Sequence, residues 1–139
     1  MFNRILVPVD LSKRSLIAVD LAYKLAAQFR SEVILLHVIE TIEHVEFDEL
    51  KGFYQRLEAS ARKQLQEFSE RFIETKLQVD QAIVYGHRTK EIVDHAAANR
   101  VDLIVMSSHR IEPDRLGHDW TSISHAVAIL SPCPVLLVK

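Results

Sequence analysis

Short apolar runs alternate with longer amphipathic stretches along the whole chain. The runs have the length and the Val, Ile and Leu content of buried strands, whereas the longer stretches repeat their apolar positions every three or four residues, as helices do. The expected strands cover residues 4–9, 32–39, 76–85, 101–106 and 133–138. The expected helices cover residues 15–29, 47–72, 89–100 and 121–130, and Ser12 is the expected N-cap of the first.

This β-α-β-α-β-α-β-α-β order predicts an α/β fold in a single domain over residues 1–139. Apolar strands that alternate with amphipathic helices form a parallel sheet with helices on both faces. Ligands of such sheets bind beyond the carboxyl ends of the strands, where the strand order reverses. The polar residues after the first and fourth strands are therefore the first candidates for a site.

Composition narrows the class of partner. Of the 139 residues 48% are hydrophobic, and 17 basic and 19 acidic side chains give a net charge of −2. That balance argues against a nucleic-acid partner, which needs a basic face. The single cysteine, Cys133, excludes a disulfide within the chain. Because no apolar run is long enough to cross a bilayer and the first residues do not resemble a signal peptide, we expect a soluble, cytoplasmic protein without a membrane partner.

The first strand ends in the polar turn "VPVDLS". Asp10 follows a buried strand and precedes a helix, so its carboxylate can accept hydrogen bonds from a ribose or from a backbone amide. The alternative is that Asp10 only caps the following helix. Pro8 lacks an amide donor, which predicts that the strand ladder is interrupted there and that space is left at the strand end.

The fourth strand ends in "SSHR", residues 107–110, and "TSIS" opens the last helix at 121–124. Hydroxyls and the guanidinium of Arg110 can bind phosphate, and a helix N-terminus offers free amides to an anion. Ordinary helix capping by Thr or Ser is the alternative.

Other chemistry lacks its signature in the sequence. The seven histidines form no HExxH pair or Cys/His cluster, so we expect no required metal. No G-x-S-x-G nucleophile turn, dinucleotide-binding G-x-G-x-x-G or Walker motif is present. Cys133 lies between two prolines at an apolar strand start, where packing is its expected role.

In order and spacing, the segments "ILVPVDLS", "VILLHVI", "YGHRTKEIVDHAAANRVDLIVMSSH" and "SPCPVLLVK" resemble the universal stress protein family of the UspA-like kind. The resemblance covers the whole chain. It implies a five-stranded parallel sheet of order 3-2-1-4-5, an adenine-nucleotide alpha-hydrolase-like arrangement, and a homodimer formed through the C-terminal strand. It also implies an adenine held mainly by backbone groups near Val9 and Val38, with Asp10 at the ribose.

Many members of that family bind ATP through a loop of pattern G-x-x-G-(nine residues)-G-[ST]. Matched to this chain, Ser107, Arg110 and Thr121 replace the three glycines, and the loop is one residue longer than the pattern. Side chains at these positions crowd the space of a triphosphate, and a left-handed backbone costs a residue other than glycine about 1–2 kcal/mol. The resemblance therefore implies a degenerate phosphate cradle in this loop.

Two functions stay open at this point. The first is a stress-response protein that binds ATP or another adenine nucleotide with an altered phosphate grip. The second is a nucleotide-free module that interacts with a protein partner, and a slow ATPase ranks third because no residue is placed as a base. The residues that the first hypothesis assigns to the site are Pro8, Val9, Asp10, Val38, Met106, Ser107, His109, Arg110, Thr121, Ser122 and Ile123.

Overall fold

The computed structural model describes residues 1–108 and 122–139. The strands are β1 (Arg4–Pro8), β2 (Glu32–Glu40), β3 (Val79–Gly86), β4 (Leu103–Ser107) and β5 (Val135–Val138). The α-helices are α1 (Arg14–Phe29), α2 (Lys51–Ser69), α3 (Arg88–Ala98) and α4 (Ile123–Leu130), and two 3-10 helices, η1 (Phe47–Leu50) and η2 (Glu70–Thr75), flank α2.

The strands form one five-stranded sheet of order β3-β2-β1-β4-β5, and every adjacent pair is parallel. The α/β class and the strand order predicted from the sequence are therefore confirmed. Since the order reverses between β1 and β4, the carboxyl ends of these two strands border the crevice in which such sheets bind ligands.

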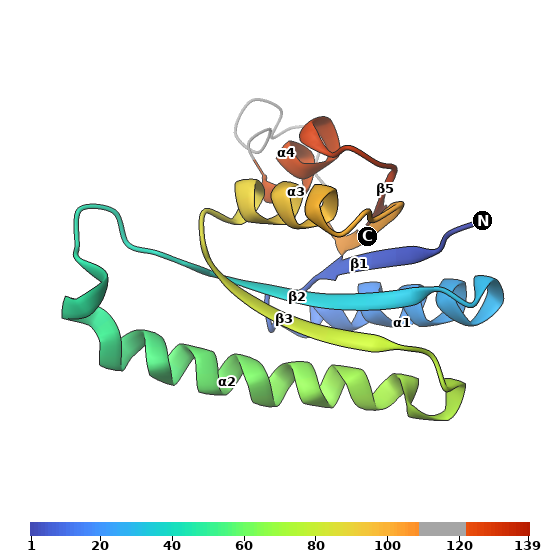
Figure 1. Ribbon diagram of the computed structural model, residues 1–139, viewed down its shortest axis with the longest axis horizontal. Coiled ribbons are helices and arrows are strands. Elements are labelled where there is room, and N and C mark those ends of the chain that lie inside the picture. Colours follow the sequence, from blue (N-terminus) through green and yellow to red (C-terminus); the bar gives the residue numbers. More distant parts are fainter. Residues whose placement is uncertain (109–121) are drawn as a thin grey trace.

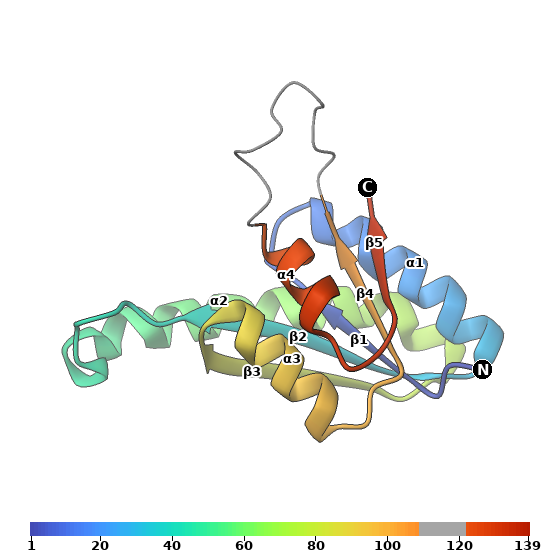
Figure 2. The same ribbon diagram turned by 90° about the horizontal axis from the view of Figure 1, so that it is seen from above.

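Helices cover both faces of the sheet, as Figures 1 and 2 show. Successive side chains of β1 point to opposite faces of the sheet and so belong to two different cores. Ile5 and Val7 pack with residues of α1, α2 and η2, whereas Leu6 packs with residues of α3 and α4. These three side chains have no exposed surface. The carboxyl end of β1 is thereby held between two packed layers, and the turn that follows it starts from a fixed position.

The prediction of a single long helix over residues 47–72 is wrong at both ends, because the α-helix covers only Lys51–Ser69. A 3-10 helix precedes α2 and another follows it, and the apolar stripe is buried only in part: Tyr54, Leu65 and Phe72 are buried, whereas Phe47 is 46% exposed. Figure 1 shows the N-terminal end of α2 reaching past the ends of the strands, so no sheet lies beneath that part of the stripe.

Candidate functional site

Pro8 is the last residue of β1, and its nitrogen, which carries no hydrogen, faces β4. Val9 donates its N–H to the carbonyl oxygen of Leu36 in β2 at 2.8 Å, so by the alternation of a strand the amide that Pro8 lacks would face β4. Pairing between β1 and β4 is restricted to Ile5 with Leu103 and Leu6 with Ile104. The two strands therefore separate beyond Leu6, as Pro8 predicts, and a space opens between their carboxyl ends.

Asp10 organises the turn between β1 and α1. Its Oδ1 accepts hydrogen bonds from the Ser12 N–H at 2.9 Å, from the Ser12 hydroxyl at 2.5 Å and from the Ser15 hydroxyl at 2.8 Å. The Ser15 oxygen in turn accepts the Asp10 N–H at 3.0 Å, and Ser15 is fully buried. The carboxylate thus fixes the entry to α1 without being the residue that caps it.

The expectation that Ser12 is the N-cap is wrong. Lys13 occupies the N-cap position and its side chain makes no capping hydrogen bond. Ser12 instead donates its hydroxyl to the carboxylate of Asp10 and is therefore part of the turn.

The carboxyl group of Asp10 is ionised at neutral pH. Burial would raise its pKa, but hydrogen bonds from Ser12 and Ser15 and the positive charge of Arg88 outweigh that effect and leave the pKa below its usual value. All three hydrogen bonds are accepted by Oδ1. The second oxygen of the charged carboxylate, Oδ2, can therefore accept a hydrogen bond from a further donor.

His37 and Val38 border the space from the side of β2. His37 Nδ1 lies 2.8 Å from the carbonyl oxygen of Val9. Because a carbonyl only accepts, Nδ1 carries the proton and Nε2 is the acceptor in the neutral ring. The backbone of Val9 therefore has its N–H in the sheet and its carbonyl oxygen paired with an imidazole.

Serine hydroxyls join the end of β4 to the start of α4. The N–H of Ser108 bonds to the Val138 carbonyl at 2.8 Å, and the Ser124 hydroxyl donates to Ser108 Oγ at 3.0 Å. Ser122 is the N-cap of α4, and its hydroxyl oxygen accepts the N–H of His125 at 3.3 Å. The capping alternative considered for the "TSIS" segment therefore describes Ser122, which also faces the space beyond β1.

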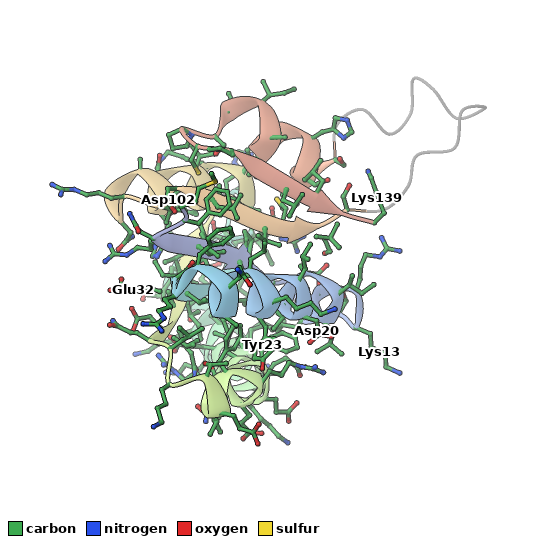
Figure 3. The ribbon with its side chains drawn as sticks, turned by 90° about the vertical axis from the view of Figure 1, so that its right-hand side faces the viewer. Lys13, Asp20, Tyr23, Glu32, Asp102 and Lys139 are labelled. Carbon is green, nitrogen blue, oxygen red and sulfur yellow. The ribbon has the colours of Figure 1, made fainter. Side chains whose placement is uncertain are left out.

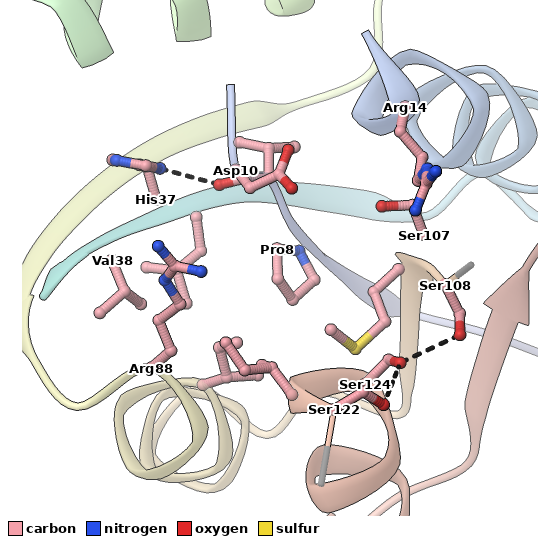
Figure 4. A pocket seen from close by; sticks show the side chains of 15 residues that line it. Pro8, Asp10, Arg14, His37, Val38, Arg88, Ser107, Ser108, Ser122 and Ser124 are labelled. Carbon is pink, nitrogen blue, oxygen red and sulfur yellow. Dashed lines mark hydrogen bonds between the residues drawn. The ribbon is translucent and has the colours of Figure 1, made fainter. Parts of the chain in front are cut away.

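These segments enclose one cavity of about 380 Å³, within the range of roughly 300–1,000 Å³ typical of ligand pockets. Figure 4 shows the side chains that line it. They are Pro8, Val9, Asp10, Arg14, Leu36, His37, Val38, Arg88, Ile92, Met106, Ser107, Ser108, Ser122, Ile123 and Ser124.

The structure brings most of the site residues predicted from sequence together around this cavity. They are Pro8, Val9, Asp10, Val38, Met106, Ser107, Ser122 and Ile123. His109, Arg110 and Thr121 lie outside the described residues, as does most of the predicted phosphate loop.

Sequence reasoning missed two basic residues of the lining, Arg14 and Arg88. Each is the first residue of a helix that follows a strand, Arg14 in α1 and Arg88 in α3. Because the carboxyl ends of parallel strands share one edge of a sheet, the helix starts after them also converge there. A search for basic residues at helix starts could have found both.

Within residues 1–108 and 122–139, no group of three or more His, Cys, Asp or Glu side chains could hold a metal ion. No helix in this same part of the chain is long and apolar enough to span a membrane.

A parallel sheet of this order, with a cavity at the carboxyl ends of β1 and β4, defines a doubly wound α/β fold whose cavity lies where such sheets bind ligands. The family model of the universal stress protein family matches residues 1–139. The chain therefore belongs to the universal stress protein family, as its sequence predicts.

Relatives in sequence support the same assignment. The chain is 32% identical to the universal stress protein YxiE of Bacillus subtilis, with all of both chains covered. It is 29% identical to the universal stress protein MJ0577 of Methanocaldococcus jannaschii, covering all of this chain and 96% of that protein.

Solved structures share the fold over nearly the whole chain. The structure of MJ0577 matches with a TM-score of 0.80 at 30% identity, covering 100% of this chain and 96% of that one. A universal stress protein in complex with cAMP matches with a TM-score of 0.77 at 22% identity, covering 99% and 97% of the two chains. The complex of the Archaeoglobus fulgidus universal stress protein with dAMP matches with a TM-score of 0.72 at 16% identity, covering 99% and 98%.

Proposed function

We propose that this protein is a small stress-response module that binds an adenine nucleotide in the cavity between β1 and β4, with a degenerate phosphate grip. The observation that carries the proposal is the cavity itself, which has backbone groups of β2 at one end and hydroxyls of β4 and α4 at the other. Two proteins of the same fold are complexes with cAMP and with dAMP, which are both adenine nucleotides.

The base end of the proposed site is the backbone of Val38. In β2, Val33 bonds to the β3 side through Gln78 and Leu36 bonds to the β1 side through Val9, so the alternation directs the N–H and carbonyl of Val38 towards β1. Pairing of β1 with β2 ends at Pro8 and Leu36, so β1 has no paired residue at the level of Val38. A donor and an acceptor side by side suit the N1 and the N6 amino group of adenine.

The ribose would lie beside Asp10. The lowered pKa keeps its carboxylate ionised, and Oδ2 can accept a ribose hydroxyl while Oδ1 holds the turn. Pro8 and Met106 supply apolar surface along the cavity between the two ends. The serine hydroxyls at the end of β4 and the start of α4 would then face the first phosphate.

Calorimetric titration with AMP, ADP and ATP tests the proposal. Because side chains replace the glycines of the phosphate loop, we expect binding that does not strengthen as phosphates are added. Native mass spectrometry of the purified protein would reveal any retained nucleotide. An absence of both heat and thermal shift at millimolar ligand, with no retained nucleotide, would refute the proposal.

A nucleotide-free interaction module is the second candidate function. It is favoured by the replacement of all three loop glycines and by the hydrogen bonding of Asp10, whose Oδ1 is satisfied by Ser12 and Ser15 without a ligand. In either case we expect no robust ATP turnover. A cytoplasmic location stays a prediction.

The proposal includes a homodimer through β5. This strand lies at the end of the sheet and pairs with β4, and Leu136 on it is 39% exposed. Leu136→Glu should convert a dimer to a monomer in sedimentation experiments. Ile42→Glu, at an apolar residue that is 48% exposed and lies before η1, should leave the dimer intact. A monomeric wild-type protein would contradict this part.

A further inference from the structure

The cavity has two ends of different chemistry. Figure 4 shows Val38, His37 and Arg88 at one end, and Arg14 with Ser107 and the other labelled serines at the opposite end. The first end lies beside β2 and the second beside β4, and these two strands lie on either side of β1. Neighbouring strands are about 4.8 Å apart, so the two ends are separated by roughly 10 Å.

A nucleotide whose base is bound at Val38 would place its phosphate at the opposite end of the cavity, where Arg14 lies. The proposed base contact fixes one end of the ligand, and Asp10 lies between the two ends at the carboxyl end of β1 (Figure 4). An ionised carboxylate repels a phosphate, so the phosphate is favoured away from Asp10, at the end with the serines.

Arg14 is the basic side chain of the described lining at that end. It is exposed and is the first residue of α1. Arg88 lies at the other end, and its Nε is already 3.9 Å from a carboxylate oxygen of Glu40. The positive charge of Arg88 also helps to lower the pKa of Asp10. Within the described residues the side chain of Arg14 makes no hydrogen bond or ion pair, so its five N–H donors are available to a ligand.

From these observations we propose that Arg14 binds the first phosphate of the nucleotide and gives the site its preference for nucleotides over nucleosides. The inference rests on the proposed function and adds a phosphate ligand from α1. Arg14 and the serines of α4 lie at the same end of the cavity but border it from different sides (Figure 4). A guanidinium holds a phosphate through two parallel N–H donors, which a lysine cannot reproduce. The positive charge would add an attraction for phosphate in a chain whose sequence lacks the three glycines of the family's phosphate loop.

The test compares two ligands across four proteins. AMP and adenosine differ only by the phosphate, and calorimetry gives the dissociation constant of each for the wild type, Arg14→Gln, Arg14→Lys and Lys13→Gln. Lys13 is the matched control: it is the preceding residue and has the same charge, but it does not line the cavity, and Figure 3 shows it pointing away from the body of the protein.

We expect the wild type to bind AMP more tightly than adenosine. Arg14→Gln should weaken AMP binding about tenfold and leave adenosine binding within about twofold, because only the phosphate loses a partner. Lys13→Gln should change neither constant by more than about twofold. Arg14→Lys should fall between the wild type and Arg14→Gln, and the advantage of AMP over adenosine should shrink as salt is added.

Failure of this inference is distinguishable from failure of the proposed function. If the wild type binds AMP and adenosine equally, or if Arg14→Gln weakens both ligands alike or neither, Arg14 is not the phosphate ligand although the site stands. If the wild type binds neither ligand, the inference on Arg14 is overturned; the proposed function is overturned as well if ADP and ATP also fail to bind and the purified protein retains no nucleotide. Because Arg14 is exposed and lies at a helix start, Arg14→Gln should fold as the wild type does.

Discussion

Removal of the Asp10 carboxylate should destabilise the protein by an amount that the turn geometry defines. Oδ1 accepts three hydrogen bonds, but the two from Ser12 are exposed to water and contribute little. The third comes from Ser15, which is fully buried, so Asp10→Ala leaves a buried hydroxyl without its acceptor. That costs about 1–3 kcal/mol, and we expect a loss of about 2 kcal/mol in the free energy of unfolding.

Urea unfolding at neutral pH and equal protein concentrations measures this loss. With a slope of about 2 kcal/mol per molar urea, Asp10→Ala should lower the midpoint by about 1 M. Asp10→Asn keeps an oxygen in the position of Oδ1 and should lose about 1 kcal/mol or less. Ser12→Ala removes only an exposed bond and should lie within about 0.5 kcal/mol of the wild type.

Either of two results would show that the buried bond to Ser15 does not determine the effect of Asp10→Ala. One is a stability of Asp10→Ala within about 0.5 kcal/mol of the wild type, since the bond to Ser15 would then carry no weight. The other is a loss for Ser12→Ala as large as that for Asp10→Ala, because the exposed half of the turn would then dominate.

Three further predictions concern the same framework. Since the pKa of Asp10 in the folded protein lies below its unfolded value of about 3.9, its ionisation stabilises the fold above that pH and the benefit is lost as pH falls through the folded-state pKa. The advantage of wild type over Asp10→Asn in urea midpoint should thus shrink on acidification, and an advantage that grows would contradict the sign. Gly86→Ala should cost more than about 1–2 kcal/mol in urea unfolding, because Gly86 has φ +149° and an added Cβ would lie 2.6 Å from Glu91 Oε1. Adding Glu91→Ala should recover only the part due to this contact, and full recovery would show that the backbone is not strained. Ser122→Ala removes the N-cap bond to His125 and should lower the melting temperature by about 3–5 °C for a loss near 1 kcal/mol, whereas an unchanged melting temperature would mean that the cap is not needed.

Much of the fold could be predicted from the sequence because its signals are local. Apolar runs such as β2 and the three- and four-residue repeat of α1 each follow from burial of one element, and their alternation implies a parallel sheet. Pro8 indicated correctly where the ladder between β1 and β4 stops, because a missing amide is visible in the sequence. The crevice followed from these two inferences.

The details that failed depend on contacts that the hydrophobic pattern does not encode. Ser12 has the composition of an N-cap, but a carboxylate two residues earlier takes its hydroxyl. The N-terminal part of the α2 stripe is partly exposed because it reaches past the ends of the strands, which the stripe itself does not encode. Arg14 and Arg88 read as ordinary surface charges until the sheet brings two helix starts to one edge.

The most direct test of the central claim is an amide NMR titration of the wild-type protein with AMP. If adenine pairs with the backbone of Val38, the Val38 amide resonance should shift strongly, together with amides near Asp10 and Ser122. Amides of η1, which lie outside the cavity lining, should stay unchanged. A titration in which the Val38 amide does not move, or in which the shifts cluster at η1, would contradict the account.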